Sequence, residues 1–99
     1  MSVFTKRLKE ARTAAGYSQE KLGILAGIEE ASASARMNQY ERGKHQPDYS
    51  VVEKIAKILD VPEAYFYAKE DDLAELILLY HKKTSKEKRQ VILQLKEYT

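Results

Sequence analysis

The chain has 99 residues, of which 43% are hydrophobic and 32% charged, a composition typical of a folded chain and not of a disordered one. It contains no cysteine, which excludes a disulfide scaffold, a thiolate metal site and a thiol nucleophile. The net charge of +2 is unevenly distributed: residues 1–44 carry eight lysines and arginines against five acidic residues, residues 45–72 three against seven, and residues 73–99 six against three. A basic amino-terminal part indicates a surface for a polyanion, although ordinary variation among solvated faces gives the same pattern.

The whole chain is predicted to be helical, because no strand-like alternation with hairpin signals occurs. The first helix is expected over residues 3–15, with Ser2 as its amino-terminal cap and Gly16 as its left-handed stop. Its apolar side chains recur at helical spacing on one face, and we expect that face to be buried: Phe4, Leu8, Ala11 and Ala15.

Two short helices are predicted next. One begins at Gln19 behind the capping residue Ser18 and stops at Gly27, and the other is expected over residues 33–42, with Ser32 or Ser34 as its cap. Gly23 lies in the middle of the first of these, where a glycine costs roughly 1 kcal/mol relative to alanine. Such a glycine indicates that the backbone of another element approaches closely.

Four more helices complete the prediction: residues 49–59 behind Asp48, a short helix over residues 63–67 that Pro62 opens, residues 72–81, and residues 86–98. Thr84 and Glu87 have the spacing of a capping box for the last one. The core is expected to include Tyr40, Val52, Ile55 and Phe66.

The last two predicted helices carry more apolar residues than their own contacts would use. One stripe is Leu73, Leu76, Ile77 and Tyr80, widened by Leu78 and Leu79, and another is Val91, Ile92, Leu95 and Tyr98. A second copy of the chain would cover this surface. We therefore expect a homodimer through Leu76, Leu79, Tyr80, Val91, Ile92 and Leu95.

The pair of short helices has the helix-turn-helix pattern. Gly23 allows the two helices to cross closely, Gly27 turns the chain, and Met37 and Tyr40 anchor the second helix. The opposite face of that helix must then point outward, as in proteins that insert a helix into the major groove of DNA.

The same region resembles the DNA-binding domain of the Cro and lambda-repressor type, whose regulators are often called the xenobiotic-response-element family. The resemblance covers residues 3–67 and depends on residues 18–22 (SQEKL), 26–28 (AGI), 41–44 (ERGK), Pro47 and 55–61 (IAKILDV). It implies a five-helix DNA-binding domain that works as a dimer on a palindromic operator. The thirteen residues between Gly27 and Glu41 exceed the spacing common in the family, so positions are counted back from Glu41.

The resemblance implies DNA contacts at named positions. By the count from Glu41, the base-reading positions are Ser34, Ala35 and Gln39, and Arg36 and Asn38 lie on or beside the same surface. Their chemistry is suitable, because arginine pairs with guanine, Asn or Gln with adenine, and a methyl group contacts that of thymine. The positions that contact phosphate are Gln19, Arg42 and Lys44, with Lys21, Arg7, Lys9 and Arg12 as further candidates.

An enzyme is excluded as an interpretation, since no nucleophile elbow, phosphate-binding glycine loop or metal-ligand spacing is present. No catalytic residue, cofactor or metal is expected. The chain also lacks a secretory signal and an apolar run of about 18 residues, so a cytoplasmic, nucleoid-associated protein is expected.

The sequence therefore predicts an all-α bacterial or phage-type transcriptional regulator, a dimeric repressor of inverted-repeat operators. Residues 1–67 are expected to form a lambda-repressor-like DNA-binding domain of five helices. Residues 72–99 are expected to add two helices that dimerise it. The alternative is a protein-interaction module, such as an antitoxin or adaptor, that binds a partner protein through the carboxyl-terminal helices.

Overall fold

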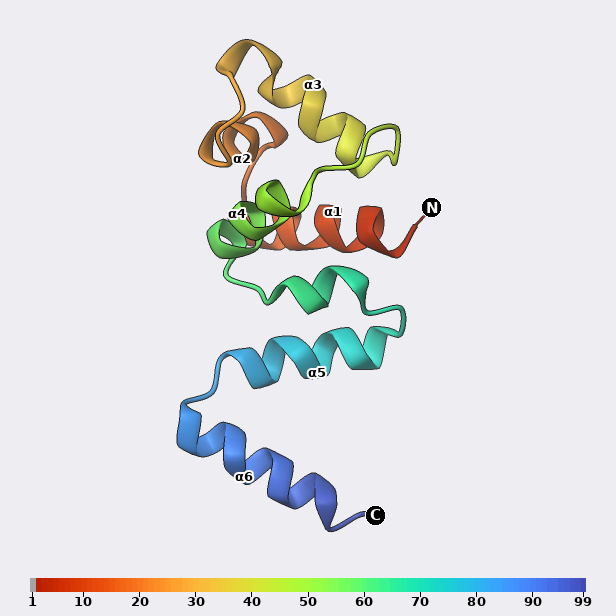
Figure 1. Cartoon of the computed structure of the whole chain (residues 1–99), viewed down its shortest axis with the longest axis vertical. Coiled ribbons are helices and arrows are strands. Elements are labelled where there is room, and N and C mark those ends of the chain that lie inside the picture. Colours follow the sequence, from red (N-terminus) through yellow and green to blue (C-terminus); the bar gives the residue numbers. More distant parts are fainter. Residues whose placement is uncertain (1) are drawn as a thin grey trace.

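The computed structural model describes residues 2–99 and, within them, the chain forms helices without any strand. The molecule is elongated, with dimensions of 51 × 26 × 22 Å, and α1 to α4 gather at one end while α6 lies at the other (Figure 1). The elements in chain order are α1 Val3–Ala15, α2 Gln19–Leu25, α3 Glu30–Glu41, α4 Tyr49–Leu59, the short 3₁₀ helix η1 Glu63–Tyr67, α5 Asp71–His81 and α6 Ser85–Lys96.

The predicted amino-terminal caps of α1, α2 and α4 are confirmed. The side chains of Ser2, Ser18 and Asp48 accept hydrogen bonds from backbone amides three residues later, at 3.2, 3.0 and 3.1 Å. Gly16 ends α1 with φ at +80°, a backbone conformation that glycine adopts without steric cost. These local signals account for the starts of the three helices and for the end of α1.

The predicted start of α3 is wrong. The helix begins at Glu30 and not at Ala33, and neither Ser32 nor Ser34 is its cap. Glu29 occupies the cap position and makes no side-chain capping bond. The tight turn after α2 explains the early start, since the Ile28 amide donates to the Gly23 carbonyl at 3.0 Å and the chain re-enters helix within two residues.

The core lies between α1, α2, α3, α4 and η1. Its largest fully buried side chains are Phe66, Leu8, Leu22, Met37 and Ile55. The predicted core residues Tyr40, Val52, Ile55 and Phe66 are all buried. Ala15 is exposed, contrary to prediction, because it belongs to the last turn of α1, next to the stop at Gly16.

Helix α5 packs on η1 and buries only part of its predicted apolar stripe. Ala74 is buried, and Ile77 and Leu78 pack partly against the core, whereas Leu73 and Leu76 are 44% and 43% exposed. Both ends of α5 are bonded to the body of the molecule: Asp71 accepts from Arg7 at 3.0 Å, and His81 contacts Asp60 at 3.0 Å.

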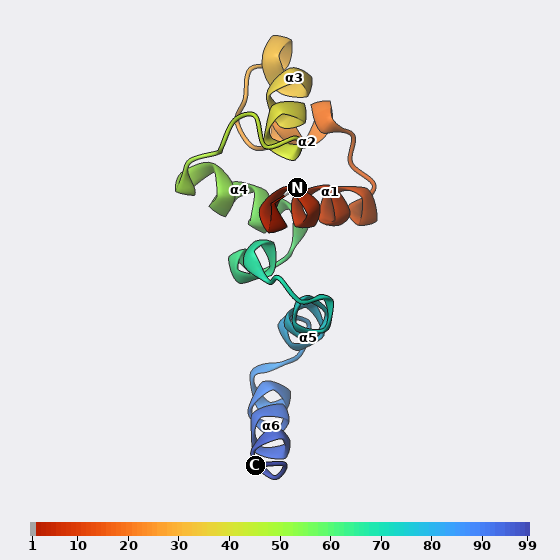
Figure 2. The same cartoon turned by 90° about the vertical axis from the view of Figure 1, so that its right-hand side faces the viewer.

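Helix α6 projects from this body and buries none of its residues (Figure 2). Its predicted capping box is confirmed, with the Glu87 amide donating to Thr84 at 3.2 Å and the Thr84 amide donating to Glu87 at 3.0 Å. Both helices differ slightly from the predicted ranges, since α5 begins one residue earlier and α6 covers residues 85–96 in place of 86–98. Over residues 2–99, no helix has the length and apolar character needed to cross a membrane.

Candidate nucleic-acid interface

Helices α2 and α3 cross at Gly23, as the sequence predicts. A Cβ atom at this position would lie 2.8 Å from the Ala33 carbonyl oxygen and 2.9 Å from the Ala33 Cβ. Both distances are shorter than the contacts that Cβ atoms make in proteins, and the Ala33 carbonyl oxygen belongs to the backbone, which cannot easily shift. Only glycine therefore permits this spacing between the two helices.

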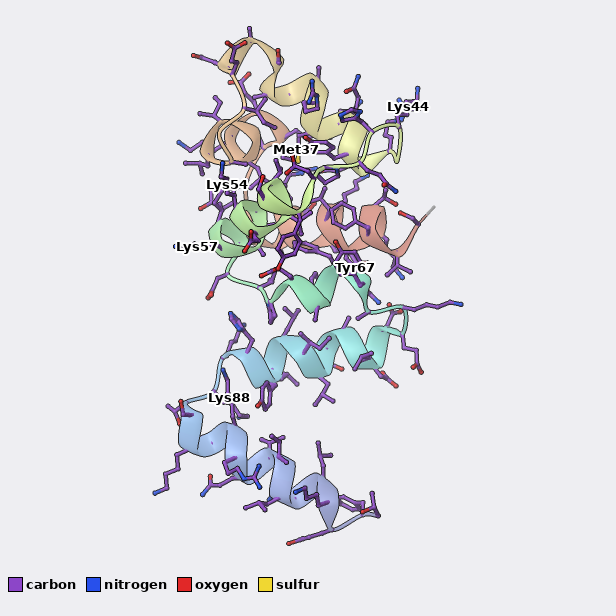
Figure 3. All side chains as sticks on the ribbon, viewed as in Figure 1. Met37, Lys44, Lys54, Lys57, Tyr67 and Lys88 are labelled. Carbon is purple, nitrogen blue, oxygen red and sulfur yellow. The ribbon has the colours of Figure 1, made fainter. Side chains whose placement is uncertain are left out.

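The outward face of α3 is defined by the residues it buries. Ala33, Met37, Tyr40 and Glu41 point inward, and Figure 3 shows Met37 below α3, toward the core. At 3.6 residues per turn, the opposite face is centred on Ala35 and Gln39, which are both exposed.

The five residues predicted to contact bases lie at the centre of this face and on its two sides. Ser34 and Arg36 are exposed on its two flanks, and Asn38 is half-buried on the side of α2. The face also includes the exposed residues Ala31 and Ser32, which were not predicted because the helix was expected to begin at Ala33. The longer connection between Gly27 and Glu41 therefore adds a turn to α3.

A buried polar network holds α3 against α1 and α2. Glu41 is 3% exposed and accepts two hydrogen bonds from the Arg12 guanidinium, at 2.5 and 3.1 Å. Gln19, at the first position of α2, donates hydrogen bonds from its amide nitrogen to Glu41 at 3.2 Å and to Asn38 at 3.3 Å. One carboxylate thus links three helices, and both amide hydrogens of Gln19 have partners within the chain.

Basic side chains surround the carboxyl-terminal half of α3. Lys21, Arg36, Arg42 and Lys44 are exposed, and Figure 3 shows Lys44 on the loop after α3, at the outer edge of the molecule. Lys54 of α4 also reaches the turn between α2 and α3, where its Nζ lies 3.7 Å from the position of a Cβ on Gly27. Lys54 was not among the predicted contacts, because its position depends on the packing of α4.

Two weaker phosphate candidates are removed by the structure. Arg7 is 2% exposed and donates to the Ala68 carbonyl at 2.9 Å and to Asp71 at 3.0 Å. Although burial lowers the pKa of Arg7, its hydrogen bond to Asp71 and the charge of Glu10 outweigh that effect and raise it. Arg12 is held by Glu41 and the Tyr17 carbonyl, so neither guanidinium is free for phosphate.

The amino-terminal end of α3 is acidic. Glu29 before α3 and Glu30 in its first turn are exposed, whereas Glu20 lies in the first turn of α2, next to Gln19 and so near the carboxyl-terminal end of α3. Along α3 itself, the basic side chains therefore lie in the carboxyl-terminal half and in the loop behind it, while Lys54 of α4 adds positive charge at the turn before the helix. In the described part of the chain, no group of three His, Cys, Asp or Glu side chains is arranged to hold a metal ion.

Comparison with known proteins agrees with this geometry. The family model of the helix-turn-helix domain matches residues 4–65. The solved structure of the transcriptional regulator BswR is similar over nearly the whole chain, with a TM-score of 0.89 and 48% identity over 98% of this chain and 94% of that one. This likeness includes α5 and α6, beyond the range of the family model.

Two curated relatives are similar over the amino-terminal part. The prophage-derived HTH-type transcriptional regulator YonR of Bacillus subtilis is 37% identical over 60% of this chain, and an HTH-type regulator of Sinorhizobium medicae is 36% identical over 62%. The matches cover 51% and 41% of those relatives, so this chain spans about half of their length or less. With its crossed α2 and α3 and its matched residues 4–65, the chain belongs to the helix-turn-helix family of transcriptional regulators.

Proposed function

We propose that this protein is a sequence-specific regulator that binds double-stranded DNA with α3 in the major groove. The observation that carries the proposal is the geometry of α3, which is anchored by Met37 and Tyr40 and presents Ala35 and Gln39 to solvent. A single helix fits the B-form major groove, which is about 12 Å wide. The basic residues at one end of the helix supply the attraction to phosphate that such binding requires.

The side chains of α3 have distinct roles in this proposal. Gln39, in the middle of the outward face, pairs with adenine, and Arg36 at its flank pairs with guanine. Ala35 contacts a thymine methyl group, and Ser34 and Asn38 extend the readout toward α2. Asn38 keeps a fixed orientation because it accepts a hydrogen bond from Gln19.

The phosphate contacts are assigned to Lys21, Arg42 and Lys44, with Gln19 in a supporting role. Because Gln19 uses its amide hydrogens within the chain, it positions α2 and Asn38, and the lysines and arginine supply the charge. These contacts set the orientation of α3 without reading the sequence.

We further propose that the protein acts as a homodimer and represses transcription from an inverted repeat. Residues 1–67 serve as the DNA-binding part and residues 72–99 as the dimerisation part. The support is the apolar surface of α5 and α6, on which Leu76, Leu79 and Leu95 are 43%, 56% and 49% exposed. The half-buried side chains of Tyr80, Val91 and Ile92 extend that surface, and a two-fold dimer would place two α3 helices in successive major grooves about 34 Å apart.

The experiment is selection from a random duplex library with the full chain at near-physiological salt. Enrichment of one inverted repeat, with half-sites about one helical turn apart, supports a dimeric sequence-specific regulator. Enrichment of no sequence, with binding that disappears as salt increases, contradicts it and leaves only non-specific attraction. The apolar helices would then point to the alternative of an antitoxin or adaptor that binds a partner protein.

A further inference from the structure

Helices α5 and α6 carry opposite charges at their amino-terminal ends. Residues 70–75 read EDDLAE, with four carboxylates and no basic residue, whereas residues 82–99 contain six lysines and arginines against two acidic residues. Lys6 and Arg7 already neutralise Asp71. Asp72 and Glu75 are exposed and form no ion pair within residues 2–99.

These two charged segments cannot meet within one chain. Asp72 and His81 are separated by about 13 Å of helix, and the basic segment begins only after His81. That separation exceeds the Debye length of about 8 Å at physiological ionic strength, so the attraction between the two segments is largely screened. Figure 1 shows α5 and α6 diverging from the turn that joins them, with the start of α5 at the far end from the start of α6.

The apolar stripes run beside these charges. On α5, Leu73, Leu76 and Leu79 are exposed, and helical periodicity places Asp72 and Glu75 along the edge of that stripe. On α6, Val91, Ile92 and Leu95 share a face with Lys88, whose Nζ lies 5.3 Å from the centre of the Tyr80 ring. The apolar stripe of α6 therefore begins next to α5 of the same chain. Further along, α6 leaves α5, and the rest of the stripe has no surface of its own chain to pack against.

From this arrangement we propose that a second copy of the chain docks by reciprocal exchange of α6. The two α5 helices lie antiparallel across a two-fold axis, with their leucine stripes in contact. The end of one α5 then meets the start of the other, which brings the partner's Lys86 and Arg89 onto Asp72 and Glu75. Each α6 covers the partner and not its own α5, so the contact is self-complementary and closes at two copies. This inference rests on the dimer of the proposed function and specifies its geometry.

Charge reversal with complementation tests the exchange. One variant carries Asp72→Lys and Glu75→Lys, and the other carries Lys86→Glu and Arg89→Glu. In an exchanged dimer of either variant, like charges face each other at both copies of the contact between the two chains. Self-association measured by sedimentation should therefore weaken about tenfold or more at low salt. An equimolar mixture should regain wild-type affinity as a heterodimer. The matched control reverses an exposed pair on α4, Glu53→Lys with Lys57→Glu, and should associate like the wild type.

A cross-linking experiment tests the same geometry without relying on charge. Because the chain has no cysteine, single cysteines can be placed at Asp72 or Glu75 in one copy and at Lys86 or Arg89 in the other. Oxidation of a mixture should give a disulfide-linked dimer that joins the two different variants, which requires Cα atoms within about 7 Å. Far-ultraviolet circular dichroism confirms that each variant folds.

The outcomes separate this inference from the proposal beneath it. A wild-type chain that stays monomeric at all concentrations and on DNA would overturn the dimer itself. A wild-type dimer whose charge variants do not complement each other, or in which cysteines at Asp72 link to each other, would overturn only the exchange. Complementation together with the mixed disulfide supports both.

Discussion

The two ends of this molecule use their apolar residues in opposite ways. In α1 to α4 and η1, Leu8, Leu22, Met37, Ile55 and Phe66 are fully buried, and a buried ion pair adds hydrogen bonds between helices. In α6 nothing is buried, and Leu93 and Leu95 are about half exposed. The first region buries its core within a single chain and holds α3 by packing and hydrogen bonds, whereas the second leaves apolar side chains uncovered.

The largest expected effect comes from the ion pair of Arg12 and Glu41. Replacing Glu41 by Leu leaves the guanidinium without its partner in a largely buried position and should destabilise the fold by about 3–5 kcal/mol. Chemical denaturation of Glu41→Leu against the wild type measures this loss. The double variant Arg12→Met with Glu41→Leu should recover much of it, because no charge is then left unpaired. Equal stability of the single and double variants would contradict this account.

The second prediction compares one substitution in both regions. Leu22→Ala removes a fully buried side chain and should cost about 2–5 kcal/mol of unfolding free energy at any protein concentration. Leu95→Ala removes a half-exposed side chain and should leave the unfolding of the dilute monomer unchanged while weakening self-association. Thermal melts at two protein concentrations distinguish the loss of monomer stability from the loss of self-association. A loss from Leu95→Ala that is independent of concentration would show that α6 belongs to the monomer core.

The third prediction separates reading of sequence from attraction to phosphate. On the selected duplex, Gln39→Ala should reduce discrimination at one base pair by about 1–3 kcal/mol and leave non-specific affinity intact. Arg42→Ala should weaken binding to every duplex and reduce the slope of log K against log salt by about one. Fluorescence anisotropy over a salt series measures both quantities. If the two variants behave alike, the division of roles is wrong.

The smallest expected effect is at the join between the regions. The hydrogen bond from Lys6, followed by that from Arg7, lowers the pKa of Asp71. A lowered pKa means that the ionised carboxylate stabilises the fold above about pH 4, the ordinary range for aspartate, and that this contribution disappears as pH falls through the folded-state value. Asp71→Asn should therefore lower the melting temperature slightly at pH 7 and by a vanishing amount near pH 2. A difference that is constant with pH would remove the ionic explanation.

Local signals predicted most of the fold. Ser2, Ser18 and Asp48 bond to amides of the turn that follows each of them, so the starts of α1, α2 and α4 are readable from a few adjacent residues. The start of α3 could not be read in this way, because Glu29 makes no capping bond. What favours the early start is the tight turn after α2 and the close approach of Ala33 to Gly23.

The exposed face of α3 was predicted from the sequence, but the hydrogen bonds that hold this helix in place were not. Exposure of Ala35 and Gln39 follows from the helical spacing of Met37 and Tyr40. The bonds among Arg12, Gln19 and Glu41 join residues that are 22 to 29 apart in sequence, and no local pattern signals them. The packing of α5 on η1 likewise has no local signal, since the small Ala74 packs inward and the larger Leu73 and Leu76 do not.

The central claim is that two chains, joined by the surfaces that one chain leaves uncovered, present two α3 helices to one DNA site. Native mass spectrometry of the full chain with its selected duplex tests this most directly. The account predicts two chains per duplex, and a large loss of affinity when one half-site is scrambled or when Leu76 and Leu95 are replaced by Ala. One chain per duplex, bound with the same affinity to an isolated half-site, would contradict it.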